Sequence, residues 1–109
     1  MINIVFLKHK DNIIGFEAKG HANFDIKGKD IVCSAVSSII IGGLNAINNI
    51  SNFEVKIQNG HVKCLSNNKI DIHDQIVIET IEVQLRTIQD SFGDFVKIEE
   101  RNESYGTKI

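Results

Sequence analysis

Apolar side chains at every second position along the chain predict five β-strands. The alternating runs cover residues 2–6, 14–18, 53–57, 61–65 and 95–99. The polar segment Lys8–Asn12 separates the first two runs, and Asn59-Gly60 separates the third from the fourth. An Asn-Gly pair readily adopts the positive φ angles of a two-residue turn. We therefore expect each of these pairs of runs to form an antiparallel hairpin.

Apolar residues three or four positions apart predict two helices between the strands. The first begins at Asp30, a predicted N-cap, and presents an apolar face formed by Val32, Ala35, Val36, Ile39, Ile40, Gly43 and Ile47. The second begins near Asp71 or Asp74 and carries the apolar stripe Ile78, Ile81, Leu85 and Ile88. Gly42 and Gly43 in the first helix favour either close packing on the sheet or a contact between subunits.

The resulting order of elements, ββαββαβ, predicts an α+β fold. A mostly antiparallel sheet of about five strands, with two helices packed on one face, buries every apolar stripe. Residues 1–101 are expected to form a single domain. The polar, glycine-containing segment 102–109 is expected to fray.

Composition narrows the classes of function. Twelve basic and fourteen acidic residues give a formal charge of −2 without a basic stripe, which argues against direct nucleic-acid binding. No apolar run approaches the roughly 18 residues of a membrane span, and the apolar start, Met1–Leu7, is too short for a signal peptide. We therefore expect a cytoplasmic protein whose two cysteines are free thiols.

Cys33 is the main candidate for chemistry. It lies near the start of the first helix, twelve positions after His21; Gly20 directly precedes His21, and Gly28 lies between the two residues. The N-terminus of a helix stabilises a thiolate, and a nearby histidine can accept the proton of a thiol. A cysteine in an apolar helix is more often a buried core residue. The neighbouring histidine and glycines favour the catalytic interpretation.

The other cysteine and the remaining histidines are weaker candidates. Cys64 lies mid-strand on the same face as Val62, which is typical of a core residue. His9, His61 and His73, together with the cysteines, lack the spacing of a zinc site. No phosphate-binding or dinucleotide-binding motif occurs, so we expect neither a metal nor a cofactor.

Two segments together resemble the ribosomal-processing cysteine protease family of low-GC bacteria, often called Prp. They are Gly20-His21-Ala22, followed by Gly28, and Asp30-Ile31-Val32-Cys33-Ser34-Ala35-Val36-Ser37. The resemblance extends over essentially the whole chain, since its length and element order also agree. Two positions depart from the family pattern: Ser34 replaces a usual alanine, and Asp25 stands where many members have glycine.

The resemblance implies a nucleophile, Cys33, and a partner, His21, with Asp30 and Ser37 as supporting residues. It also implies a metal-free homodimer that removes the N-terminal extension of the large-subunit ribosomal protein numbered twenty-seven, cutting after an aromatic residue. The loop Ala22–Lys29 would be a mobile cover over the substrate.

We further expect backbone N–H groups at the start of the first helix, those of Cys33 and Ser34, to stabilise the oxyanion. Two other functions stay open at this point. A ribosome-associated assembly factor would bind the same protein without cutting it. A thiol-based redox sensor would link Cys33 to Cys64.

Overall fold

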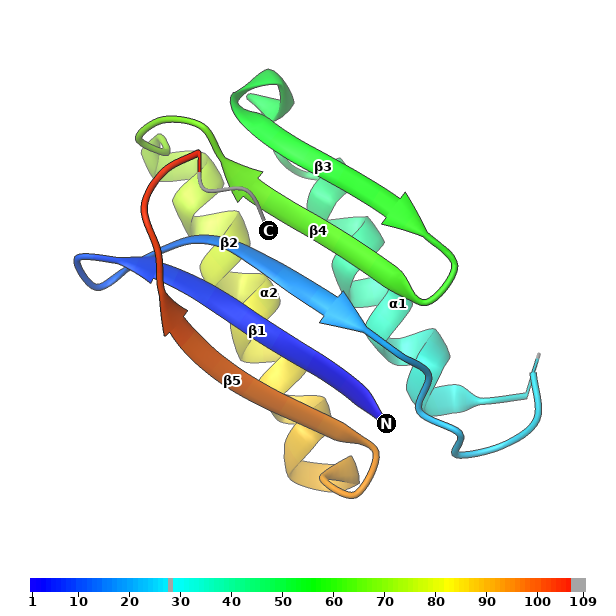
Figure 1. The fold of residues 1–109 in the computed structure, drawn as a ribbon. Helices are drawn as coiled ribbons and strands as arrows, with labels where there is room; N and C mark the ends of the chain where they lie inside the picture. The colour runs from blue at the N-terminus through cyan, green and yellow to red at the C-terminus, as the bar shows by residue number, and fades with distance from the viewer. Residues whose placement is uncertain (28, 107–109) are drawn as a thin grey trace.

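The computed structural model describes residues 1–27 and 29–106 and has the predicted order of elements, ββαββαβ (Figure 1). The strands are β1 (Ile2–His9), β2 (Asn12–Lys19), β3 (Phe53–Gln58), β4 (His61–Ser66) and β5 (Val96–Asn102). The helices are α1 (Ile31–Asn45) and α2 (Ile72–Phe92), and a short 3₁₀ turn, Ile50–Asn52, precedes β3. The α+β fold predicted from the sequence is confirmed.

All five strands form one sheet in the order β3-β4-β2-β1-β5. Both predicted hairpins are present and antiparallel, while β5 pairs with β1 in parallel. The β3–β4 turn has Gly60 at φ +73°, as its Asn-Gly sequence predicted. The β1–β2 turn instead has positive φ at Lys10 and Asp11, two residues without a glycine's freedom.

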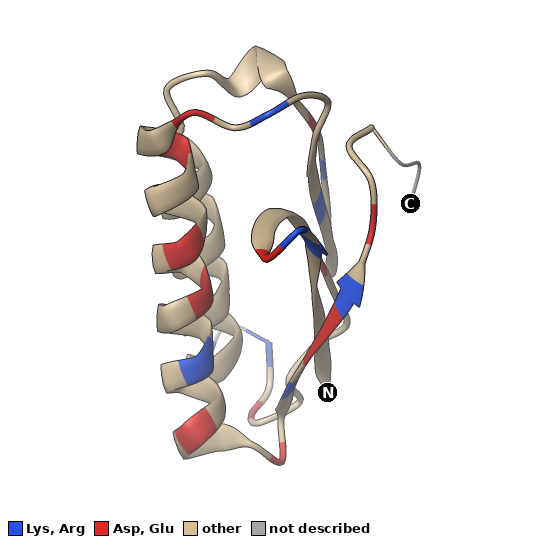
Figure 2. Ribbon diagram, turned by 90° about the vertical axis from the view of Figure 1, so that its left-hand side faces the viewer, with Lys and Arg blue, Asp and Glu red and all other residues tan. Residues whose placement is uncertain are grey.

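Both helices lie on the same face of the sheet, as Figures 1 and 2 show. The predicted stripe of α2 faces the core, where Ile78, Ile81 and Leu85 are buried. A side chain at Gly43 would collide with the side chain of Ile81, so this glycine permits close contact between α1 and α2 rather than between α1 and the sheet. A side chain at Gly42 would meet no atom within 4 Å.

The segment after β5 crosses the other face of the sheet (Figure 1). The N–H of Glu103 donates to the carbonyl of Lys8, and the N–H of Gly106 donates to that of Ser66. Tyr105 packs against the core, with its ring centroid 5.1 Å from that of His9. The segment 103–106 therefore contacts the sheet, and β5 ends later than predicted, at Asn102; that the tail frays stays a prediction. Residues 107–109 lie outside the described part of the chain.

Neither helix in the described ranges is long and apolar enough to cross a bilayer. The longer one, α2, contains several charged residues (Figure 2), among them the predicted pair Glu82 and Arg86, whose side chains are joined at 3.0 Å. Its exposed side also carries the apolar residues Ile72, Ile76 and Val83.

Candidate active site

A cleft of about 590 Å³ lies between α1 and the β3–β4 hairpin. The side of α1 that contains Cys33 and Ser37 forms one wall, and residues of the hairpin form the other. His21 and Asp30 also line the cleft. The structure therefore brings together, around one cavity, four residues that the sequence placed in the site.

Cys33 lies in the first turn of α1. The predicted N-cap residue, Asp30, does cap this helix. The Asp30 carboxylate accepts a hydrogen bond from the N–H of Cys33 at 2.9 Å. The N–H of Ala22 points at the Cys33 Sγ from the other side, at 3.2 Å. Cys33 is partly exposed, so a substrate in the cleft can reach its sulfur.

Asp30 joins the start of α1 to the loop that follows β2. One carboxylate oxygen binds Cys33, and the other accepts from the N–H of Phe24 at 2.9 Å and of Asp25 at 3.4 Å. The hydrogen bond from the N–H of Cys33, with those of the loop, lowers the pKa of the Asp30 carboxyl. Asp30 therefore acts as an ionised cap that fixes the position of the loop relative to the thiol.

His21 comes directly after Gly20, the residue that follows the end of β2. Gly20 has a φ of +100°, and its N–H donates to the carbonyl of Gly60 at 2.9 Å. The imidazole of His21 lies over Gly60, so close that an added Cβ there would be 2.7 Å from Nε2. Among the described residues no hydrogen bond joins His21 to Cys33, although both side chains line the cleft.

The loop between His21 and Asp30 is anchored by an aromatic contact. The ring of Phe24 meets Phe92 and Phe95 edge-on, with centroids 5.5 and 5.1 Å away. These two rings come from the end of α2 and from the turn that precedes β5. Ala22, expected in the mobile cover, is buried. Gly28, expected in the same cover, lies outside the described residues.

The two N–H groups that were expected to stabilise the oxyanion, those of Cys33 and Ser34, already donate hydrogen bonds within the protein. The N–H of Cys33 donates to the Asp30 side chain, and the N–H of Ser34 donates to the Asp30 carbonyl at 3.1 Å. The N–H of Ser34 makes the first hydrogen bond within α1, and the N–H of Cys33 is one of the unpaired donors at the helix start that the cap satisfies. That these two groups stabilise an oxyanion stays a prediction, and the N–H of Ala22 is a further donor beside the sulfur.

Cys64 is buried in the centre of the sheet, as its position in the strand pattern predicted. Burial raises the pKa of its thiol to about 12. It therefore stays protonated at neutral pH and has no access to solvent.

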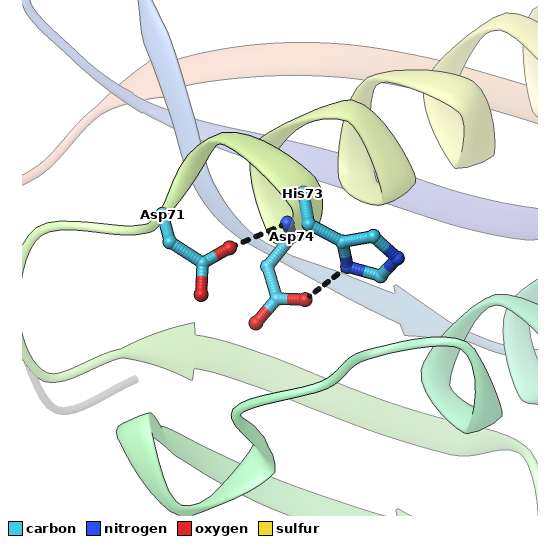
Figure 3. Close-up of side chains that lie close together, drawn as sticks. All are labelled: Asp71, His73 and Asp74. Carbon is cyan, nitrogen blue, oxygen red and sulfur yellow. Dashed lines mark hydrogen bonds and ion pairs between the residues drawn. The ribbon is translucent and has the colours of Figure 1, made fainter.

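A separate cluster of Asp71, His73 and Asp74 lies at the start of α2 (Figure 3). Their donor atoms lie within 4.8 Å of one another, a spacing that suits a metal ion. The two carboxylate oxygens of Asp74, however, accept the N–H groups of Asn48 at 2.8 Å and Asn49 at 3.0 Å. The cluster thus has a structural use, which is to hold the segment after α1 against the start of α2.

The two carboxylates of this cluster have different roles. Asp71 caps α2 by accepting the N–H of Asp74, and His73 Nδ1 lies 2.8 Å from an Asp74 oxygen (Figure 3). Burial raises the pKa of Asp74, but hydrogen bonds from His73, Asn48 and Asn49 outweigh it, so the pKa lies below its usual value. Asp74 is therefore ionised although only 1% of it is exposed.

The contact between Gly60 and His21 is a feature of the site that the sequence did not reveal. The Asn-Gly pair predicted a turn, and nothing local indicated that this turn would support a histidine almost forty residues earlier. The apolar side chains on the walls of the cleft were missed for the same reason.

Comparison with known proteins places these residues in a family context. A family model described as cysteine protease Prp matches residues 1–97. A Bacillus subtilis protein named ribosomal processing cysteine protease Prp is 30% identical over 98 residues, covering 83% of this chain and 88% of that protein. A Mycoplasma genitalium protein of the same name is 38% identical over 94 residues, covering 81% and 87%.

A solved structure has the same fold. The crystal structure of the ribosomal processing protease Prp from S. aureus, with a covalently linked product peptide, matches with a TM-score of 0.82. The match covers 93% of this chain and all of the other, at 24% identity. A second crystal structure of the S. aureus protein, with a substrate peptide, matches with a TM-score of 0.79.

Proposed function

Since this chain belongs to the Prp family of cysteine proteases, we propose that Cys33 is its nucleophile and His21 its general base. The observation that carries this assignment is the shared cleft, in which a partly exposed thiol at the N-terminus of α1 and an imidazole both reach the cavity. Cys64 has no comparable access, because it is buried within the sheet.

In the proposed reaction His21 takes the thiol proton, and the Cys33 thiolate attacks the carbonyl carbon of the scissile peptide bond. The imidazolium then donates its proton to the leaving amine, which yields an acyl-enzyme thioester. A water molecule, deprotonated by His21, hydrolyses the thioester and restores the thiol. The N–H of Ala22, now directed at the sulfur, is positioned to donate to the oxyanion.

The proposed supporting roles of Asp30 and Ser37 follow from their positions and contacts. Asp30 holds α1 and the loop in register, which fixes the distance between the segment with His21 and the thiol. Ser37 lies one helical turn beyond Cys33 in the same cleft, where its hydroxyl can bind the backbone of the substrate. We propose that the loop 22–29 rearranges when substrate binds, since His21 must approach Cys33 for proton transfer.

We propose that the substrate is the N-terminal extension of the large-subunit ribosomal protein numbered twenty-seven, cut after an aromatic residue. Support comes from the relatives, which are named ribosomal processing proteases, and from the peptide-bound S. aureus structures of the same fold. Such a substrate places the enzyme in the cytoplasm. We also propose that it acts as a homodimer, without a metal or cofactor and without direct contact to nucleic acid or membrane.

The test is cleavage of the extended ribosomal protein, followed by intact-mass spectrometry. Cys33→Ser and His21→Ala should each abolish the mass loss while leaving the circular dichroism spectrum unchanged. His9→Ala is the matched control, because His9 does not line the cleft and this change should leave cleavage unchanged. Full activity in either site variant would contradict the assignment, and an unchanged substrate mass with the wild-type protein would favour a binding factor.

A further inference from the structure

The walls of the cleft carry apolar as well as polar side chains. Beyond Cys33 and His21, its walls carry Ile41 from α1 and Ile57 from β3, and its floor is closed by buried apolar residues of the sheet. Ile57 is 56% exposed and Ile41 is 37% exposed. Two large apolar side chains that face a cavity in this way are suited to contact an apolar group of a ligand.

The distance between the thiol and this apolar region follows from the helix. Cys33, Ser37 and Ile41 occupy successive turns of the same face of α1, and all three line the cleft. Eight residues of helix span about 12 Å. An extended peptide rises about 3.3 Å per residue. A peptide whose scissile carbonyl lies at Cys33 therefore reaches Ile41 with its third or fourth residue.

The direction of the peptide follows from the proposed chemistry. The leaving amine must face His21, whose ring lies over Gly60 at the hairpin end of the cleft. The acyl part of the substrate, which precedes the scissile bond, then extends along α1 toward Ile41.

We infer that Ile41 and Ile57 form a specificity subsite for a large apolar side chain three or four residues before the scissile bond. This inference rests on the proposed protease function and goes beyond it, because it names a second position at which the substrate is recognised. Such a subsite helps the enzyme to discriminate its substrate from other peptides, because the one residue next to the scissile bond would by itself give little specificity.

The subsite is tested by placing a charge first in the substrate and then in the enzyme. Peptides that the wild type cuts are prepared in pairs that differ at one position, with Leu in one peptide and Asp in the other. The varied position moves over four residues on each side of the scissile bond. In the wild type, Asp at the third or fourth residue before the bond should lower kcat/KM about tenfold or more. Ile57→Lys should weaken or reverse this preference, because its ammonium group can pair with the Asp.

Ile76→Lys is the matched control. Ile76 is 57% exposed but lies on α2, outside the cleft, so its variant should keep the wild-type preference. Ile57→Ser is a second variant that adds no charge, and it should lower kcat/KM for the Leu peptide selectively. For each variant, the rate of Cys33 alkylation by iodoacetamide reports whether the site is intact.

The outcomes separate the inference from the function on which it rests. If the wild type cuts no peptide, the proposed function fails. If it cuts and Ile57→Lys keeps the full preference for Leu, or if the sensitive position follows the scissile bond, the subsite is refuted. A change of oligomeric mass in light scattering with unchanged preference would likewise refute it, and would assign this surface to a contact between subunits.

Discussion

Gly60→Ala tests whether the β3–β4 turn positions the catalytic histidine. Gly60 has a φ of +73°, and a Cβ there would lie 2.7 Å from Nε2 of His21 and 3.1 Å from its Cε1. Ordinary van der Waals contacts of this kind are about 3.5–4.0 Å, so the ring must retreat by roughly 1 Å. The imidazole can swing away because the cleft is open beside it, which makes the change a catalytic perturbation more than a structural one.

The expected magnitude has two parts. An L-residue in the left-handed conformation costs about 1–2 kcal/mol, which a domain stable by about 5–15 kcal/mol tolerates. A displacement of about 1 Å at a catalytic group costs about a hundredfold in rate. We therefore expect Gly60→Ala to fold and to lose about two orders of magnitude in kcat, with a smaller effect on KM.

The assay is steady-state peptide cleavage alongside urea unfolding. Gly106→Ala is the matched control, because Gly106 has a φ of +71° and the nearest atom to an added Cβ is 4.0 Å away. Both substitutions place alanine at a positive φ, so both should lower the free energy of unfolding by a similar amount. Only Gly60→Ala also displaces the His21 ring. Equal kcat values in the two variants would refute the positioning role, as would a loss of activity that merely follows the loss of stability.

Three further predictions concern stability and thiol reactivity. Iodoacetamide at neutral pH should modify Cys33 and leave Cys64 unmodified, which mass spectrometry of peptides would show. Gly42→Ala should raise the free energy of unfolding by about 1 kcal/mol, whereas Gly43→Ala should lower it by about 1–3 kcal/mol through overpacking; urea unfolding that ranks them otherwise would contradict the packing account. Asp74→Ala should cost about 3 kcal/mol, because two backbone N–H groups lose their partner. Since the folded pKa of Asp74 is lowered, the part of its contribution that depends on its charge is complete at neutral pH and should be lost progressively as the pH falls below about 4; a mutational difference that does not shrink on acidification would contradict this.

Much of the fold could be predicted because its determinants are local. The alternation in β1 and β2, the Asn-Gly turn and the stripe of α2 each follow from short-range periodicity, and the structure contains all of them. The contacts of the tail with the sheet could not be predicted, because its composition is polar and the contacts depend on one aromatic residue, Tyr105, and two backbone hydrogen bonds. A single anchoring side chain leaves no periodic signal.

The site could be predicted only in part, for a related reason. The positions of Cys33 and Asp30 follow from helix capping, which acts within three residues. The support of His21 by Gly60, and the meeting of Phe24 with Phe92, depend on how distant elements are arranged in the sheet. A pattern along the chain identifies the reactive residue types, whereas the geometry that makes them act together is tertiary.

We propose that the hydrogen bond from Ala22 to the sulfur takes part in the reaction. The N–H of Ala22 lies 3.2 Å from the Cys33 Sγ. When the carbonyl carbon is attacked, negative charge moves from sulfur to the adjacent oxygen, and the same N–H can follow it. The N–H of Cys33 already donates to the Asp30 side chain. In the proposed mechanism the segment Gly20–Ala22 therefore supplies both the proton acceptor, His21, and the oxyanion donor, and we expect its position relative to Cys33 to determine the rate.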